Sequence, residues 1–210
     1  MKLVIFGATG KTGQLLVKEA LDAGNNVVIY ARNPAKIDVK NERLSIIQGE
    51  LSDQEKIEST VKGAGAVLSL LGPKGGSKSK PLTLGIENII TAMKKLGVRR
   101  LIAISTLSAK DPRDQPEFRA RFLVAVVKLI MRSAYNEIVG VANVIRQSDV
   151  DWTILRLTLL NDKRKSGKVR VGYLGKNELG TWISRANVAD FMLQEVNDTR
   201  YLREAPVITN

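Results

Sequence analysis

Cysteine and histidine are both absent from this 210-residue sequence. Without cysteine the chain has no disulfide, no thiolate metal site and no cysteine nucleophile, and without histidine it has no histidine-based catalytic triad. The same two absences argue against zinc and haem sites, so we expect no metal centre. Any acid–base chemistry must come from Tyr, Lys, Asp, Glu, Ser or Thr side chains, or from a cofactor and water.

Long apolar segments are missing too. No window approaches the ~18 uncharged apolar residues of a membrane span, so we expect no membrane partner. The first strand-like run starts at residue 2, which leaves no room for a signal or transit peptide and predicts a cytoplasmic protein. No linker, repeat or low-complexity tract divides the chain, and its length fits a single NAD(P)-binding type of α/β domain over residues 1–210.

Acidic residues are in the minority. The chain has 33 Lys and Arg against 21 Asp and Glu, for a net charge of +12. Such a field favours anionic ligands, nucleic acid or an anionic surface. The basic residues are scattered, however, and no nucleic-acid motif interleaves aromatic residues with them. We therefore expect a solvated basic surface that attracts an anionic cofactor, and do not expect nucleic acid as a partner.

A glycine-rich turn stands directly after the first strand-like run, residues 2–6, and before an amphipathic pattern over residues 14–21. A strand–turn–helix unit of this kind offers free backbone N–H groups to a pyrophosphate. We assign Gly7 to the tight turn, Gly10 to the close approach of a phosphate, and Gly13 to contact between helix and strand. The same turn supplies three further predicted cofactor ligands: Thr9, Lys11 and Thr12.

Arg32 follows the second strand-like run, residues 26–31. Sites that prefer NAD carry an acidic residue near this point, which accepts a hydrogen bond from the ribose 2′-hydroxyl. Arg32 cannot accept that bond, whereas its guanidinium suits a 2′-phosphate, and Lys11 adds a second positive charge. The sequence therefore predicts NADP(H) in preference to NAD(H). A solvated arginine at the end of a strand is the alternative.

Four more apolar runs predict strands, and helical patterns lie between them. The strands are expected at residues 44–48, 66–71, 100–105 and 152–157, and the helices at 54–61, 82–96, 117–147 and 185–196. This alternation predicts a Rossmann-type α/β fold, a doubly wound parallel sheet with its ligand at the carboxyl ends of the strands. Residues 158–210 are expected to add a small C-terminal substrate-side lobe, with an edge strand at 205–209.

The loops that follow the later strands are expected to face the same ligand. Cofactor contacts are predicted in these loops at Leu51, Leu71, Gly72, Ser105 and Thr106. Substrate-side contacts are predicted at Lys74, Leu157 and Leu160. Ordinary strand-to-helix turns, which Gly, Ser and Pro favour, are the alternative.

The apolar run over residues 122–131 is too hydrophobic for a helix with one buried stripe. Burial within the fold accounts for it most simply. A homo-oligomer face or a substrate lid stays open as an explanation.

Four motifs together, at residues 7–13, 104–106, 151–156 and 183–191, resemble the atypical short-chain dehydrogenase/reductase group. More narrowly, they resemble the NAD(P)H-binding proteins of the NmrA-like and flavin reductase/biliverdin reductase B-like kind. The resemblance covers essentially the whole chain. It implies a Rossmann-type sheet, NADP binding, and either hydride transfer or redox sensing.

The chain departs from that group at the catalytic tyrosine–lysine pair. Tyr135 stands at the tyrosine position, but Val139 replaces the lysine four residues later, and Leu157 replaces the usual proline after residues 151–156. Val139 cannot supply the positive charge that prepares a tyrosine for proton transfer. The usual route of alcohol dehydrogenation is therefore in doubt, and Ser105 and Tyr135 are kept as the candidate catalytic residues.

Two functions from different classes fit these observations. The first is an NADPH-dependent oxidoreductase that transfers hydride to a flavin, quinone or similar conjugated small-molecule acceptor, which takes its proton from water. Ser105 or Thr106 would then bind the carboxamide or the substrate, and Lys74 would attract an anionic acceptor. The second is a non-catalytic NADP(H)-binding redox sensor, suggested by Val139 and by the run at 122–131. A weaker third, an NADP-linked nucleic-acid binder, rests on charge alone.

Overall fold

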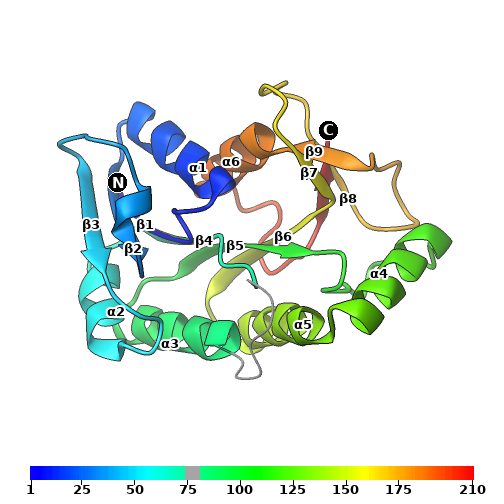
Figure 1. Cartoon of the computed structure of the whole chain (residues 1–210), viewed down its shortest axis with the longest axis horizontal. Helices are drawn as coiled ribbons and strands as arrows, with labels where there is room; N and C mark the ends of the chain where they lie inside the picture. The colour runs from blue at the N-terminus through cyan, green and yellow to red at the C-terminus, as the bar shows by residue number, and fades with distance from the viewer. Residues whose placement is uncertain (74–80) are drawn as a thin grey trace.

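The computed structural model describes residues 1–73 and 81–210 and shows a central sheet between two layers of helices (Figure 1). The main sheet has eight strands in the order β3-β2-β1-β4-β5-β6-β10-β8. Every neighbouring pair is parallel except β10 and β8. The strands are β1 (Lys2–Phe6), β2 (Asn26–Ala31), β3 (Leu44–Gln48), β4 (Ala66–Ser69), β5 (Arg100–Thr106), β6 (Asp151–Leu157), β8 (Arg170–Gly172) and β10 (Val207–Thr209). The predicted doubly wound α/β fold is confirmed.

The helices cover both faces of this sheet. On one face lie α1 (Lys11–Asp22) and α6 (Arg185–Gln194), which contact each other. On the other face lie α2 (Gln54–Val61), α3 (Pro81–Lys95) and α5 (Arg132–Gln147) (Figure 1). A short 3-10 helix, η1 (Pro34–Lys36), follows β2. The Ser184 hydroxyl caps α6 by accepting a hydrogen bond from the backbone N–H of Asn187.

Alternate residues of β1 explain why its sequence is apolar throughout. Leu3 and Ile5 belong to the hydrophobic core beneath α1 and α6, whereas Val4 and Phe6 belong to the core beneath α2 and α3. Successive side chains of a strand point to opposite faces, so a strand covered on both sides needs apolar residues at every position. All four side chains are completely buried, which stabilises the fold by ~1.5–3 kcal/mol for each.

The long helical pattern predicted over residues 117–147 is two helices in the structure. A helix α4 (Phe118–Ile130) ends before Met131, whose backbone leaves the helical conformation, and α5 then begins at Arg132. The apolar run is not buried within the fold as expected, because Leu129 and Ile130 are 84% and 75% exposed. Helix α4 lies beyond the end of α5, at the margin of the molecule, so little of the fold is near enough to cover it (Figure 1).

The C-terminal segment also differs from expectation. Strand β10 is not an edge strand, because it pairs with β6 on one side and with β8 on the other. All three of its residues are fully buried, as an interior strand requires. A strand that the sequence did not indicate, β7 (Leu159–Asn161), pairs with β9 (Trp182–Ser184) in a separate two-stranded sheet. Residues 158–210 are thus divided between the main sheet and this small one.

Candidate functional site

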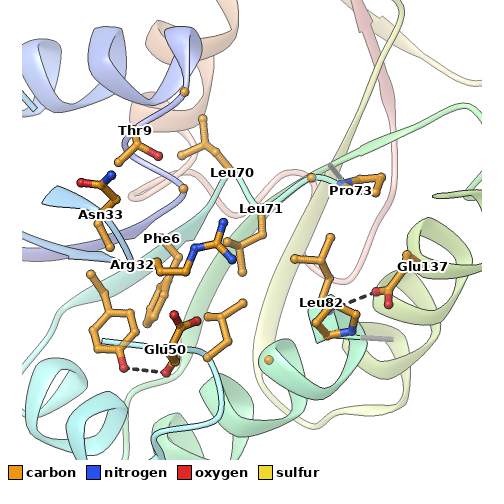
Figure 2. Close-up of a pocket in the computed structure, with 18 of the residues that line it drawn as sticks. Phe6, Thr9, Arg32, Asn33, Glu50, Leu70, Leu71, Pro73, Leu82 and Glu137 are labelled. Atoms are coloured by element: carbon orange, nitrogen blue, oxygen red, sulfur yellow. Dashed lines mark hydrogen bonds between the residues drawn. The ribbon is translucent and has the colours of Figure 1, made fainter. Parts of the chain in front are cut away.

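A cavity of about 1320 Å³ opens at the carboxyl ends of β1, β2, β3 and β4 (Figure 2). Its walls come from the glycine turn, the ends of these strands, and the starts of α3 and α5. Eight of the predicted cofactor residues line it: Gly7, Thr9, Gly10, Lys11, Arg32, Leu51, Leu71 and Gly72. The topology therefore gathers segments far apart in sequence at the edge where the parallel sheet was expected to bind its ligand.

Each glycine of the turn has a different surrounding. Gly7 has a φ of +83°, and a Cβ atom there would lie 2.6 Å from the carbonyl carbon of Leu70. At Gly13 a Cβ atom would lie 2.5 Å from the carbonyl oxygen of Gly7, so this glycine lets α1 pack on the turn. At Gly10 a Cβ atom would meet only that oxygen, at 3.6 Å, and would project into open space. The space at Gly10 fits a phosphate group that approaches the backbone.

Helix α1 presents its N-terminus to the cavity. Gly10 is its N-cap residue and provides no side-chain cap, and its first turn contains no acidic residue. The free N–H groups and the helix dipole therefore favour an anion here. Thr12 and Gly13, two predicted cofactor residues of this turn, are buried and are not among the residues that line the cavity.

Arg32 extends into the cavity from the end of β2 (Figure 2). Its side chain is exposed and forms no ion pair within residues 1–73 and 81–210. Lys36 lines the cavity nearby, while Lys11 is paired at 3.2 Å with Asp162, an exposed contact that contributes little stability. The cationic end of the cavity therefore has positive charge free for an anionic ligand.

One carboxylate also lines this end of the cavity. Glu50, in the loop after β3, is exposed, and its backbone carbonyl accepts a hydrogen bond of 2.7 Å from the hydroxyl of Tyr30. Burial, together with the charges of Asp53 and Glu50, raises the pKa of Tyr30 to about 12, so this hydroxyl stays a donor. The neighbouring Leu51 is predicted from the sequence, whereas Glu50 is not.

A second cavity, of about 170 Å³, adjoins the first. Both are lined by Leu71, Gly72, Pro73, Leu82 and Glu137, so the two cavities lie side by side and share one wall. The small cavity is mostly apolar, and its walls include the predicted residues Ser105, Thr106, Leu157 and Leu160. Lys74, which was predicted on the substrate side, lies outside the described residues.

Glu137 lines both cavities and was not identified from the sequence. Its side chain is 4% exposed, and its Oε2 atom accepts hydrogen bonds from the backbone N–H groups of Leu82 and Thr83 at 3.1 and 3.0 Å. These groups belong to the first turn of α3, so the carboxylate caps that helix from α5. The Oε1 atom is buried and has no hydrogen-bond partner among the described residues.

Tyr135 lies on α5 two residues before Glu137 but lines neither cavity. Its ring instead faces the Lys128 ammonium group of α4, at 5.6 Å from the ring centroid. Because α5 turns by about 100° per residue, positions two apart on it face different directions. The other candidate catalytic residue, Ser105, lines the small cavity.

Within the described part of the chain, no acidic cluster could hold a metal ion, and no helix is long and apolar enough to cross a membrane.

The fold and the glycine turn define a Rossmann-type dinucleotide-binding protein. The chain belongs to the NAD(P)H-binding family, whose match covers residues 7–199. This membership confirms the resemblance to NAD(P)H-binding proteins noted in the sequence.

Relatives and solved structures agree with this family. A protein of Schizosaccharomyces pombe, UPF0659 protein C216.03, is 29% identical over 209 residues, which cover 90% of this chain and 82% of the relative. The (4-alkanoyl-5-oxo-2,5-dihydrofuran-3-yl)methyl phosphate reductase of Streptomyces griseus is 27% identical over 73% of this chain but only 46% of its own length. A short-chain dehydrogenase/reductase of Veillonella parvula, solved in complex with NADP, superposes with a TM-score of 0.79. That comparison has 23% identity and covers 100% of this chain and 94% of the other.

Proposed function

We propose that this protein is an NADPH-dependent oxidoreductase that transfers hydride to a flavin, a quinone or a similar conjugated small molecule. The observation that carries this proposal is that the two cavities lie side by side and share Leu71, Gly72 and Pro73 as lining residues. A large cavity with a cationic end fits a dinucleotide, and the small apolar cavity beside it fits the ring that receives the hydride.

The residues of the large cavity fit NADPH from one end to the other. The backbone at Gly10 and the N-terminus of α1 would hold the pyrophosphate. The guanidinium of Arg32 would pair with the 2′-phosphate, and no acidic residue at the end of β2 would favour NADH instead. The nicotinamide end would then lie toward Leu71 and Gly72, at the mouth of the small cavity.

The small cavity suits a reaction that needs no strong protein acid. Bound NADPH supplies a hydride, and a conjugated acceptor takes its proton from water on its own heteroatom. Ser105 and Thr106 offer hydroxyl groups that orient the carboxamide or the acceptor. Tyr135 and Val139 line neither cavity, so no tyrosine–lysine pair is required.

This function is tested by measuring the oxidation of NADPH, through its absorbance, in the presence of a panel of flavins and quinones. We expect turnover above the protein-free rate with at least one acceptor, and a higher kcat/KM with NADPH than with NADH. The variant Gly10→Val serves as the control for contaminating reductases, because it closes the open space at the phosphate position. The absence of enzyme-dependent turnover with every acceptor would contradict the proposal.

A non-catalytic NADP(H)-dependent sensor is the second candidate, and exposed side chains of α4 favour it. Phe118, Leu129 and Ile130 are 82%, 84% and 75% exposed. Large apolar side chains exposed together in this way are typical of a surface that binds a partner. Affinity capture with and without NADP(H) tests this candidate. Partner binding that does not depend on the cofactor would remove the sensor role.

A further inference from the structure

Two residues that line the small cavity each carry a buried oxygen atom without a hydrogen-bond partner. Among the described residues, the buried side-chain polar atoms that lack a hydrogen bond are Oε1 of Glu137 and Oγ1 of Thr158, and both residues line this cavity. An unpaired buried polar group costs ~1–3 kcal/mol, so such groups are rare and require a partner or a functional reason. Their position beside an otherwise apolar wall marks a recognition site for a polar group on the occupant of the cavity.

We propose that Glu137 and Thr158 determine acceptor specificity, by selecting an uncharged single-ring conjugated compound that carries an N–H or O–H donor. The proposal rests on the proposed function only in calling the bound compound an acceptor. The chemical class of that compound follows from the residues and the volume of the small cavity. It differs from the expectation of an anionic acceptor attracted by Lys74, because the carboxylate of Glu137 repels anions from the cavity.

The hydrogen bonds of Glu137 fix which oxygen is available to a ligand. Its Oε2 atom is occupied by the N–H groups of Leu82 and Thr83 and by the Thr83 hydroxyl, at 3.1, 3.0 and 3.3 Å. These donors belong to the first turn of α3 and hold the carboxylate in one orientation. The Oε1 atom is consequently oriented in advance and can only accept a hydrogen bond, which requires a donor on the ligand.

The neighbouring hydroxyl and the volume of the cavity narrow the class of ligand further. The hydroxyl of Thr158 both donates and accepts, so it suits a second polar group on the ligand, such as a carbonyl. A volume of about 170 Å³ is close to the ~150 Å³ cavity that holds one benzene molecule. A lactam, an imide or a hydroxylated ring of six members fits these limits, whereas three fused rings would enter only by one edge.

The test compares two probes that differ only in the donor, 2-pyridone and N-methyl-2-pyridone, bound to the NADP⁺-loaded protein and followed by NMR titration. We expect 2-pyridone to bind at least ~10-fold more tightly, the factor of a hydrogen bond to a charged group. In Glu137→Gln that preference should fall to within ~3-fold. Equal binding of the two probes by the wild-type protein would overturn the proposal.

Two variants separate recognition from folding. Thr158→Val removes a hydroxyl that has no partner, so the thermal stability should be unchanged or higher while the affinity for 2-pyridone falls. Thr83→Val removes one hydrogen bond to Oε2 but leaves Oε1 intact, so stability should fall while the preference between probes remains. Loss of the preference in Thr83→Val, together with an unchanged affinity of Thr158→Val for 2-pyridone, would show a purely structural role and overturn the proposal.

The nicotinamide carboxamide also carries N–H donors, and the same experiment distinguishes it from the acceptor. If the carboxamide occupied Oε1, Glu137→Gln would weaken NADPH binding ~10-fold or more and leave the probe preference unchanged, which would overturn the proposal. The oxidoreductase function has a separate outcome. If no flavin or quinone is reduced but the preference between the probes is intact, the oxidoreductase function is contradicted and the recognition site is still supported.

Discussion

The two cavities of this protein differ in how the chain builds them. The large cavity depends on backbone: a glycine turn, a helix N-terminus and the ends of parallel strands, with the Arg32 side chain extending into it. The small cavity is built from the side chains of α3, β5, α5 and β6 and the loops beside them. Substitutions in the first region should therefore affect binding of any dinucleotide, whereas those in the second should change which acceptor is used.

The largest effects are expected at the glycine turn. Gly13→Val places a side chain against the carbonyl oxygen of Gly7 and the Cα atom of Ala8, and should prevent α1 from packing, so the fold is lost. Gly10→Val meets no such obstacle and should keep the fold while it abolishes NADPH binding. Circular dichroism and a cofactor-induced thermal shift measure the two outcomes. A normal shift in Gly10→Val would mean that the phosphates lie elsewhere.

A buried ion pair lies next to the small cavity, and its removal should have the next largest effect on the protein. The guanidinium of Arg156 is fully buried and forms hydrogen bonds of 2.6 and 2.7 Å with the carboxylate of Asp114. Burial raises the pKa of Asp114, but the bonds from Arg156 outweigh it and hold the pKa below its usual range. Because Leu157 of the small cavity follows Arg156, loosening this pair should disturb that cavity first.

We expect Asp114→Ala to lower the free energy of unfolding by ~3–5 kcal/mol, because it leaves a buried charge without a partner. Urea denaturation measures this loss. The variant molecules that remain folded should still bind NADPH, because Asp114 does not line the large cavity. A loss below ~1 kcal/mol, typical of an exposed pair, would contradict this account.

Arg32→Asp should weaken NADPH binding about 10- to 100-fold, because pairing with the 2′-phosphate is replaced by repulsion. Affinity for NADH should hold or improve, since a carboxylate accepts from the ribose 2′-hydroxyl. Fluorescence titration measures both constants. Arg43→Asp is the matched control, since Arg43 is also exposed and does not line the cavity. An equal loss of affinity in both variants would show that Arg32 acts only through the net charge of the protein and does not contact the 2′-phosphate.

A carboxyl group remote from both cavities should set a pH dependence of stability. Burial and the charge of Asp198 raise the pKa of Glu195 to about 7, against the opposing effect of Arg100. The folded protein therefore retains a proton that the unfolded chain loses near pH 4.5, so this contribution to stability is lost as the pH rises toward 7. Glu195→Gln should flatten that part of a pH series of melting temperatures. An unchanged slope would show that the group does not titrate as described.

The smallest effect is expected at Tyr135. Since its ring lines neither cavity, Tyr135→Phe should leave kcat for NADPH oxidation within a few-fold of the wild-type value. A positioned general acid contributes ~10²–10⁴-fold. A fall in kcat of a hundredfold, with fold and cofactor affinity intact, would identify Tyr135 as the proton donor after all.

The contrast between the cavities also explains what the sequence could predict. The turn from Gly7 to Gly13 and the position of Arg32 depend on neighbours in the chain, so local pattern was sufficient to place them. Glu137 could not be found in this way, because its role arises from contact with α3, more than fifty residues earlier. Its one local signal is its place on the amphipathic α5, close to the expected tyrosine.

The fold shows the same limit. Strands with continuous apolar runs were predicted within two residues of their ends, because burial on both faces leaves a clear pattern. Strand β7 is three residues long and only partly buried, so no periodicity marks it. The interior position of β10 depends on the partner strand β8, which no property of residues 205–209 alone reveals.

A crystal structure of the complex with NADPH tests the central claim most directly, because that claim assigns each cavity to one end of the cofactor. We predict the 2′-phosphate against the Arg32 guanidinium, the pyrophosphate at Gly10, and the nicotinamide ring beside Leu71 and Gly72 at the mouth of the small cavity. A 2′-phosphate that points away from Arg32, or a nicotinamide ring remote from the small cavity, would contradict the account.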